Sequence, residues 1–168
     1  MKKLLLLFLG LSLLACSKER IDGGVLIDVG VGLHYINKAG NLFDSRSPVY
    51  KESDVKIYNI TGGKEVLFSQ GNLTYSGGFD VRPVDSLGTN VIYVFVNHEL
   101  EGGKNTAKTI VRIGSDIVDT LTCQISKPNS ASSIVTKVWL NGKLKWDISN
   151  PKDPVAEFGK QRAFTIYK

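Results

Sequence analysis

Short runs of β-branched and aromatic residues, separated by turn sequences, fill most of this chain and favour sheets over helices. In the first such run, from Val25 to Ile36, every second residue is large and apolar. Between Ile27 and Tyr35, the residues that separate them are polar or glycine. A period of two places alternate side chains on opposite faces of a strand, so this segment predicts a strand with one buried face. No segment after the first fifteen residues carries a capped apolar stripe at helical spacing.

Turn sequences mark where the strands reverse. Thr61-Gly62-Gly63-Lys64 and Asn141-Gly142 each lie between two apolar runs and predict hairpins, because these residues favour the tight turns that hairpins use. Val91–Val96 is entirely β-branched or aromatic and predicts a central strand covered on both faces. Further strands are expected at 55–60, 65–68, 73–75, 79–84, 106–113, 117–125, 134–140, 143–148 and 163–167.

Strands of this length and spacing predict an all-β fold, a two-sheet antiparallel β-sandwich of immunoglobulin-like or related architecture. We expect residues 25–168 to form this single domain, because about 150 residues can bury a core without disulfide bonds.

The first fifteen residues have the features of an export signal. Lys2 and Lys3 precede the apolar run Leu4–Leu14. That run is much shorter than the roughly 20 residues of a membrane-spanning helix, so residues 1–15 are expected to be a cleaved signal peptide.

Leu13-Leu14-Ala15-Cys16 closes this signal and resembles the lipobox of bacterial lipoproteins. The resemblance implies cleavage after Ala15, a diacylglycerol on the Cys16 sulfur and further acylation, for example with palmitate, of the new amine. Residues 16–24 would then be a short lipidated tether. Ser17 resembles an outer-membrane sorting address, so we expect a lipid-anchored protein of the cell envelope, facing either the periplasm or the cell surface. Two or three acyl chains anchor a protein stably.

Charge and cysteine content argue against a nucleic-acid-binding protein and against a reactive thiol. Loss of Lys2 and Lys3 lowers the formal charge from +5 to +3, and the remaining basic residues form no run, so we expect no nucleic-acid partner. With Cys16 lipidated, Cys123 is the only remaining thiol. It alternates with Leu121 and Ile125, which predicts a buried and inert side chain.

The last hairpin carries both tryptophans. A two-residue turn at Asn141-Gly142 would place Trp139 opposite Leu144 and Lys137 opposite Trp146, with both indole rings on one face. This face is either a stacking platform for sugar rings, formed by Trp139, Trp146 and Lys137, or part of the core with the Lys137 stem over Trp146.

Other polar residues suggest weaker sites. Asp116 and Asp119 are a carboxylate pair that a hydrolase could use. His34 and His98 could bind a metal only with carboxylates such as Asp28, Asp116 or Asp119, but no ligand spacing is present, so we expect no metal and no cofactor. Asp85-Ser86-Leu87 and Asp119-Thr120-Leu121 resemble the O-glycosylation motif of Bacteroidetes envelope proteins, which implies Ser86 and Thr120 as acceptors.

The mature chain also resembles uncharacterised Bacteroidetes lipoproteins of similar size. The resemblance rests on Gly40-Asn41-Leu42-Phe43-Asp44, on 116–121 and on Val138-Trp139-Leu140-Asn141-Gly142-Lys143. It implies a β-rich domain without an established activity. The sequence therefore predicts a non-catalytic envelope module that binds a glycan or a protein, or else a structural envelope component, and a hydrolase is the less favoured alternative.

Overall fold

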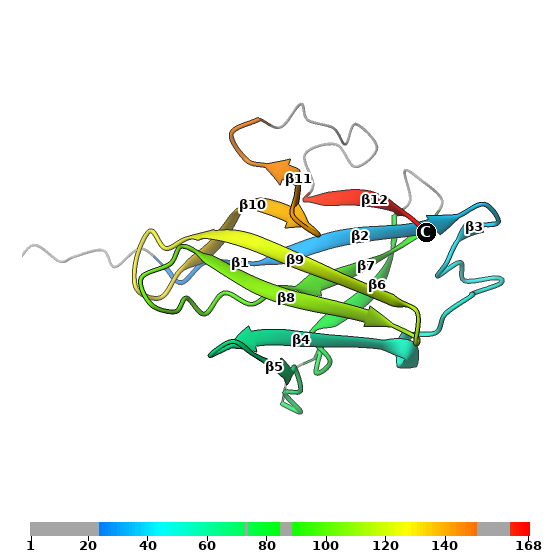
Figure 1. Ribbon diagram of the computed structural model, residues 1–168, viewed down its shortest axis with the longest axis horizontal. Coiled ribbons are helices and arrows are strands. Elements are labelled where there is room, and N and C mark those ends of the chain that lie inside the picture. Colours follow the sequence, from blue (N-terminus) through cyan, green and yellow to red (C-terminus); the bar gives the residue numbers. More distant parts are fainter. Residues whose placement is uncertain (1–23, 73, 85–88, 151–161) are drawn as a thin grey trace, which may run out of the picture.

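The computed structural model describes residues 24–72, 74–84, 89–150 and 162–168 (Figure 1). The described strands are β1 (Ile27–Asp28), β2 (Gly30–Asn37), β3 (Gly40–Asn41), β4 (Val55–Thr61), β5 (Lys64–Leu67), β6 (Phe79–Val84), β7 (Thr89–Phe95), β8 (Thr106–Ile113), β9 (Ile117–Ser126), β10 (Ser133–Leu140), β11 (Lys143–Asp147) and β12 (Ala163–Tyr167). Within these ranges the only helix is a single 3-10 turn, η2 (Glu52–Asp54). The prediction of an all-β chain is confirmed. None of the described segments forms a helix with the length and apolar character required to cross a membrane.

The strands form two curled sheets (Figure 1). The seven-stranded sheet has the order β1-β10-β9-β8-β4-β5, and β11 pairs with β10 beside this path. The five-stranded sheet has the order β12-β2-β7-β6, and β3 pairs with β2. In this second sheet the apolar run 91–96 contributes to β7, which lies between β2 and β6, so the prediction of a central strand is confirmed. The expectation that both faces of this strand are covered was wrong, because Tyr93 and Phe95 lie on the face away from the core and are only partly buried.

Two strand pairs differ from the predicted antiparallel arrangement. β1 runs parallel to β10, and β12 runs parallel to β2. Both pairs join segments that are far apart in the sequence, and parallel neighbours require a long crossover rather than a tight turn. No local turn signal exists for such a pair, so the expectation of purely antiparallel sheets was wrong at these edges.

The first predicted strand is divided between the sheets. β1 belongs to the seven-stranded sheet and β2 to the five-stranded sheet, and the chain passes from one to the other at Val29. The predicted inward positions Val31, Leu33 and Tyr35 are fully buried in β2, whereas Ile27 in β1 is exposed. The period of two therefore holds for β2 but ends where the chain changes sheets.

The core lies between the two sheets. One cluster joins Leu33 and Ile92 of the five-stranded sheet to Ile57, Leu121 and Val138 of the seven-stranded sheet. Burying a side chain of this size stabilises the fold by about 1.5–3 kcal/mol relative to leaving it in water.

Both predicted hairpins are confirmed. β4 and β5 pair around Gly62-Gly63, and β10 and β11 pair around Asn141-Gly142. Positive φ angles of 49° at Asn141 and 82° at Gly142 are those of the tight turn that this dipeptide favours. The strand expected at 73–75 is wrong, because Thr74 and Tyr75 lie in a turn and residue 73 is outside the described ranges.

Candidate functional site

The two tryptophans of the last hairpin lie on opposite faces, so the predicted platform of Trp139, Trp146 and Lys137 is not formed as expected. Trp139 is opposite Leu144, as predicted, but Trp146 is opposite Val138, and Lys137 is opposite Asp147. Val138 is fully buried, and Trp146 packs against the same core, whereas Leu144 is exposed. Trp146 therefore belongs to the inward face and Trp139 to the outward face.

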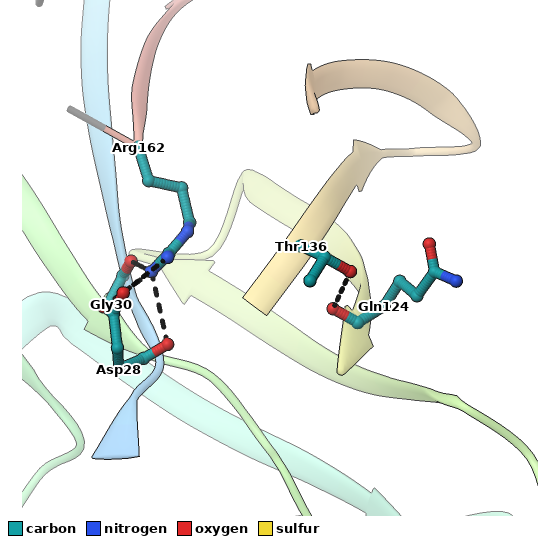
Figure 2. Close-up of polar contacts among 5 residues, drawn as sticks. All are labelled: Asp28, Gly30, Gln124, Thr136 and Arg162. Carbon is teal, nitrogen blue, oxygen red and sulfur yellow. Dashed lines mark hydrogen bonds and ion pairs between the residues drawn. The ribbon is translucent and has the colours of Figure 1, made fainter. Parts of the chain in front are cut away.

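Two local irregularities explain this difference. Thr136 is an extra residue in the pairing of β10 with β9, and its hydroxyl donates to the Gln124 carbonyl at 3.3 Å (Figure 2). Lys145 is an extra residue in the pairing of β11 with β10. Each β-bulge shifts the alternation by one residue and turns the following side chains to the other face. The turn sequence fixes the register only as far as the first bulge.

Arg162 takes the place over Trp146 that was predicted for Lys137. Its guanidinium lies 4.8 Å from the centre of the Trp146 ring and forms a two-point contact with the Asp28 carboxylate at 2.9 and 3.0 Å. It also donates to the Gly30 carbonyl at 2.8 Å (Figure 2). This buried arginine ties the start of β12 to β1, β2 and β11. We expect it to be a structural element rather than a ligand site, because its side chain is only 7% exposed.

Lys137 forms an ion pair with Asp147 at 2.8 Å. The hydrogen bond from Lys137, together with bonds from the Ser149 side chain and backbone, lowers the pKa of Asp147 to about 2. Lys137 is therefore paired with a residue of its own hairpin.

Asp116 and Asp119 have separate partners. Asp119 is fully buried and accepts hydrogen bonds from the Tyr35 hydroxyl at 3.0 Å and from Lys168 and Asn141 at 2.8 Å each. Asp116 is exposed and accepts from the Tyr50 hydroxyl at 2.6 Å. Each carboxylate is thus held in its own set of protein contacts.

The two histidines also contact different residues. His34 contacts the hydroxyls of Thr165 at 3.1 Å and Thr89 at 3.2 Å, whereas His98 lines a groove described below. Within the described ranges no group of three or more His, Cys, Asp or Glu side chains is arranged to hold a metal ion.

Several predicted features lie outside the described residues: the signal peptide 1–15, Cys16, the tether as far as residue 23, and Ser86. Thr120, the second predicted glycosylation acceptor, is partly buried in β9. Its backbone N–H donates to the Asn141 side chain at 2.8 Å.

Cys123 is buried in β9 opposite Val138, so the predicted burial is confirmed. Desolvation raises the pKa of its thiol to about 12. Because the thiolate is the nucleophile, this environment suppresses reactions of the sulfur.

We expect Cys123 to resist alkylation in the folded protein. In a Cys16→Ser variant it is the single thiol, since the chain has 2 cysteines. At pH 8 its thiolate fraction should be about a thousandfold below that of an ordinary cysteine, because the pKa is near 12 rather than about 8.5. Iodoacetamide should label it only after unfolding in urea, which mass spectrometry can follow. Rapid labelling without urea would contradict the inertness.

The described part of the chain has an open groove of about 630 Å³. Apolar side chains form much of its lining, including Ile27 from β1, Val66 and Leu67 from β5, and Phe68 and Phe95. Val66 and Leu67 are half-exposed. A largely apolar recess with a few polar groups is the usual form of a binding site. We name this feature the β5 groove.

The β5 groove lies beside an open sheet edge. β5 is the last strand of the seven-stranded sheet and pairs only with β4 among the described strands. Val66 pairs with Asn59 of β4, and the Phe68 N–H continues this ladder to the Ile57 carbonyl at 2.8 Å. Hydrogen-bonding sides alternate along a strand, so the backbone N–H and C=O groups of Glu65 and Leu67 point away from β4. These groups are available to another strand.

Asn59 supplies a polar group within the β5 groove. It follows Val55 and Ile57 on the inward face of β4, where an apolar residue would continue the pattern. Its side-chain oxygen is buried and has no hydrogen-bond partner within the described part of the chain. Buried polar atoms are normally satisfied, so this acceptor can receive a hydrogen bond from water or from a ligand. The break in alternation at Asn59 is the sequence signal for this site, and it was not among the predicted site residues.

Comparison with known proteins found no match, either among protein-family models, among curated proteins or among solved structures.

Proposed function

We propose that this chain is a non-catalytic binding module of the bacterial cell envelope, held at the outer membrane by lipid on Cys16. Its β5 groove binds an extended, apolar segment of a partner envelope protein. In this proposal the two sheets form an immunoglobulin-like β-sandwich, the architecture that the strand spacing predicted.

The observation that carries the proposal is the open edge of β5 beside an apolar groove. An extended peptide can add to such an edge, where backbone hydrogen bonds supply affinity and alternate side chains supply specificity. The N–H and C=O groups of Glu65 and Leu67 would pair with the added strand. Every second side chain of that strand would then lie beside Val66, inside the groove.

The polar atoms of the groove fit the same ligand. A backbone N–H or a polar side chain of the partner could donate to the orphaned Asn59 oxygen. A structural envelope component, the alternative from sequence, would instead need a flat apolar face for packing. A concave groove with an unsatisfied acceptor favours a ligand-binding module.

The partners of the two candidate catalytic carboxylates support a non-catalytic role. Lys168 and Tyr35 hold Asp119 in the interior, and Tyr50 holds Asp116. Neither aspartate lines the β5 groove.

Replacing Leu67 with proline is expected to abolish partner binding while the protein stays folded. Proline removes the N–H that points to the open edge, and strand edges tolerate proline where that N–H faces solvent. We expect the amount of partner recovered with the tagged protein from detergent-solubilised membranes to fall at least about tenfold, which corresponds to about 1.4 kcal/mol.

Leu67→Ala separates the two effects of this substitution, because it shortens the same groove side chain but keeps the N–H, so it should lose less partner binding than Leu67→Pro. A second pair tests the groove: Val66→Lys should block binding, and Val118→Lys, at another half-exposed valine on β9, should not. If the partner is recovered equally with Leu67→Pro and wild type, edge pairing at β5 is refuted.

A further inference from the structure

A cluster of partly exposed aromatic rings lies on the outer face of the five-stranded sheet. The Tyr75 ring stacks on Phe95, with centres 5.3 Å apart and planes inclined by 22°, and Tyr93 meets Phe95 edge-on at 6.1 Å. Phe95 also lines the β5 groove, but Tyr75 and Tyr93 do not. We name the group formed by Tyr75, Tyr93, Phe95, Asp80 and Arg82 the tyrosine platform.

The alternation of β7 places these rings outside the core. Ile92 and Val94 are fully buried between the sheets, so Tyr93 and Phe95 point to the opposite face. Gly30 on the neighbouring strand β2 makes room for Tyr93, because a Cβ atom there would lie 2.0 Å from the tyrosine ring. The Tyr93 ring is therefore held against the sheet.

An arginine is fixed between the two tyrosines. The Arg82 guanidinium lies 4.7 Å from the centre of Tyr93 and 5.5 Å from that of Tyr75. Its Nε donates to the Asp80 carboxylate at 2.6 Å, and this bond is the main reason why the pKa of Arg82 is raised. Despite these contacts the Arg82 side chain is 41% exposed, and Tyr75 is 37% exposed. Rings and polar groups are thus ordered by the protein and still accessible from solvent.

We infer that the tyrosine platform binds a neutral sugar ring. Aromatic faces offer apolar area to the C–H face of a pyranose. Beside them, a carboxylate accepts from sugar hydroxyls and a guanidinium donates to them, so Asp80 and Arg82 can serve adjacent hydroxyls of one sugar. Their opposite charges lie 2.6 Å apart and largely cancel, so the pair offers no uncompensated positive charge to a sugar carboxylate. The chemistry therefore selects neutral over acidic sugars.

This site is independent of the proposed peptide groove and can be tested separately. The full-length protein in detergent is titrated by calorimetry with neutral oligosaccharides of glucose, galactose, mannose and xylose, and with oligogalacturonate as the acidic probe. We expect at least one neutral oligosaccharide to bind with a Kd below about 1 mM. Tyr75→Ala and Arg82→Gln should each weaken that binding at least about tenfold, with Tm unchanged.

Tyr167→Ala is the matched control, because this tyrosine on β12 is 75% exposed and lies outside the platform. Its affinity should equal that of wild type. The inference is overturned if no neutral oligosaccharide binds, if oligogalacturonate binds as tightly as the best neutral one, or if Tyr75→Ala keeps full affinity. Because Arg82 does not line the β5 groove, Arg82→Gln should lose sugar binding and keep partner recovery, so the two proposals fail separately.

Discussion

Asp119→Ala is expected to lower the free energy of unfolding by about 3 kcal/mol, a large part of the roughly 5–15 kcal/mol of a typical domain. Asp119 is 0% exposed and satisfies three donors, from Tyr35, Asn141 and Lys168. Its removal leaves the buried Tyr35 hydroxyl without an acceptor. Breaking a buried ion pair costs about 3–5 kcal/mol, and the lower end applies because Lys168 is 29% exposed and can turn into water.

Urea denaturation followed by circular dichroism measures this loss. Tyr35→Phe is the informative companion, because it removes one donor and leaves Asp119 with the other two. We expect it to cost about 1 kcal/mol. The double variant should lose less free energy of unfolding than the sum of the two single losses, because both substitutions remove the same hydrogen bond. A loss below about 1 kcal/mol for Asp119→Ala would mean that this network contributes little to stability.

Arg162→Met should also destabilise the fold, by about 3 kcal/mol. Methionine keeps most of the apolar stem but loses the two-point contact with Asp28, the bond to the Gly30 carbonyl and the contact with Trp146. Hydrogen bonds to charged groups contribute about 1.5–3 kcal/mol, and a cation over an aromatic ring adds about 0.5–2 kcal/mol. Asp28 is half-exposed and can be hydrated, which limits the total.

Arg162→Lys separates charge from geometry. Lysine keeps the positive charge but lacks the planar fork that contacts both carboxylate oxygens, so we expect it to recover less than half of the loss. Urea unfolding gives the stabilities, and tryptophan fluorescence should shift because Trp146 loses its cation. Equal stability of wild type and Arg162→Met would contradict the role of this arginine in holding β12.

Local sequence signals predicted the parts of this fold that are determined by residues close together in the sequence. The Gly62-Gly63 and Asn141-Gly142 turns set two hairpins, and the apolar run at 91–96 became an internal strand of the five-stranded sheet. Burial of Cys123 followed from alternation along β9. In each case the deciding residues lie within a few positions of each other.

Features that depend on distant pairing or on bulges could not be predicted in this way. The extra residues Thr136 and Lys145 reversed the faces of the hairpin and separated the tryptophans. The parallel edges at β1 and β12 carry no turn signal. The tyrosine platform joins Tyr75, in a turn, to rings from β7, and no sequence spacing links them.

The proposed lipid anchor on Cys16 and the β5 groove are close together along the chain. Ile27 lines the groove and is eleven residues from Cys16, a span of at most about 40 Å when extended. A lipid on Cys16 would therefore keep the groove within that distance of the membrane surface. The partner that we propose is accordingly an envelope protein exposed close to the membrane.

The central claim is that this binding domain is tethered to the membrane through Cys16, and the intact mass of the protein purified from membranes tests it most directly. We predict a chain that begins at Cys16 and carries acyl chains, and a Cys16→Ser variant that is no longer retained in the membrane fraction. An unmodified chain that still begins at Met1, or equal membrane retention of the serine variant, would contradict the account.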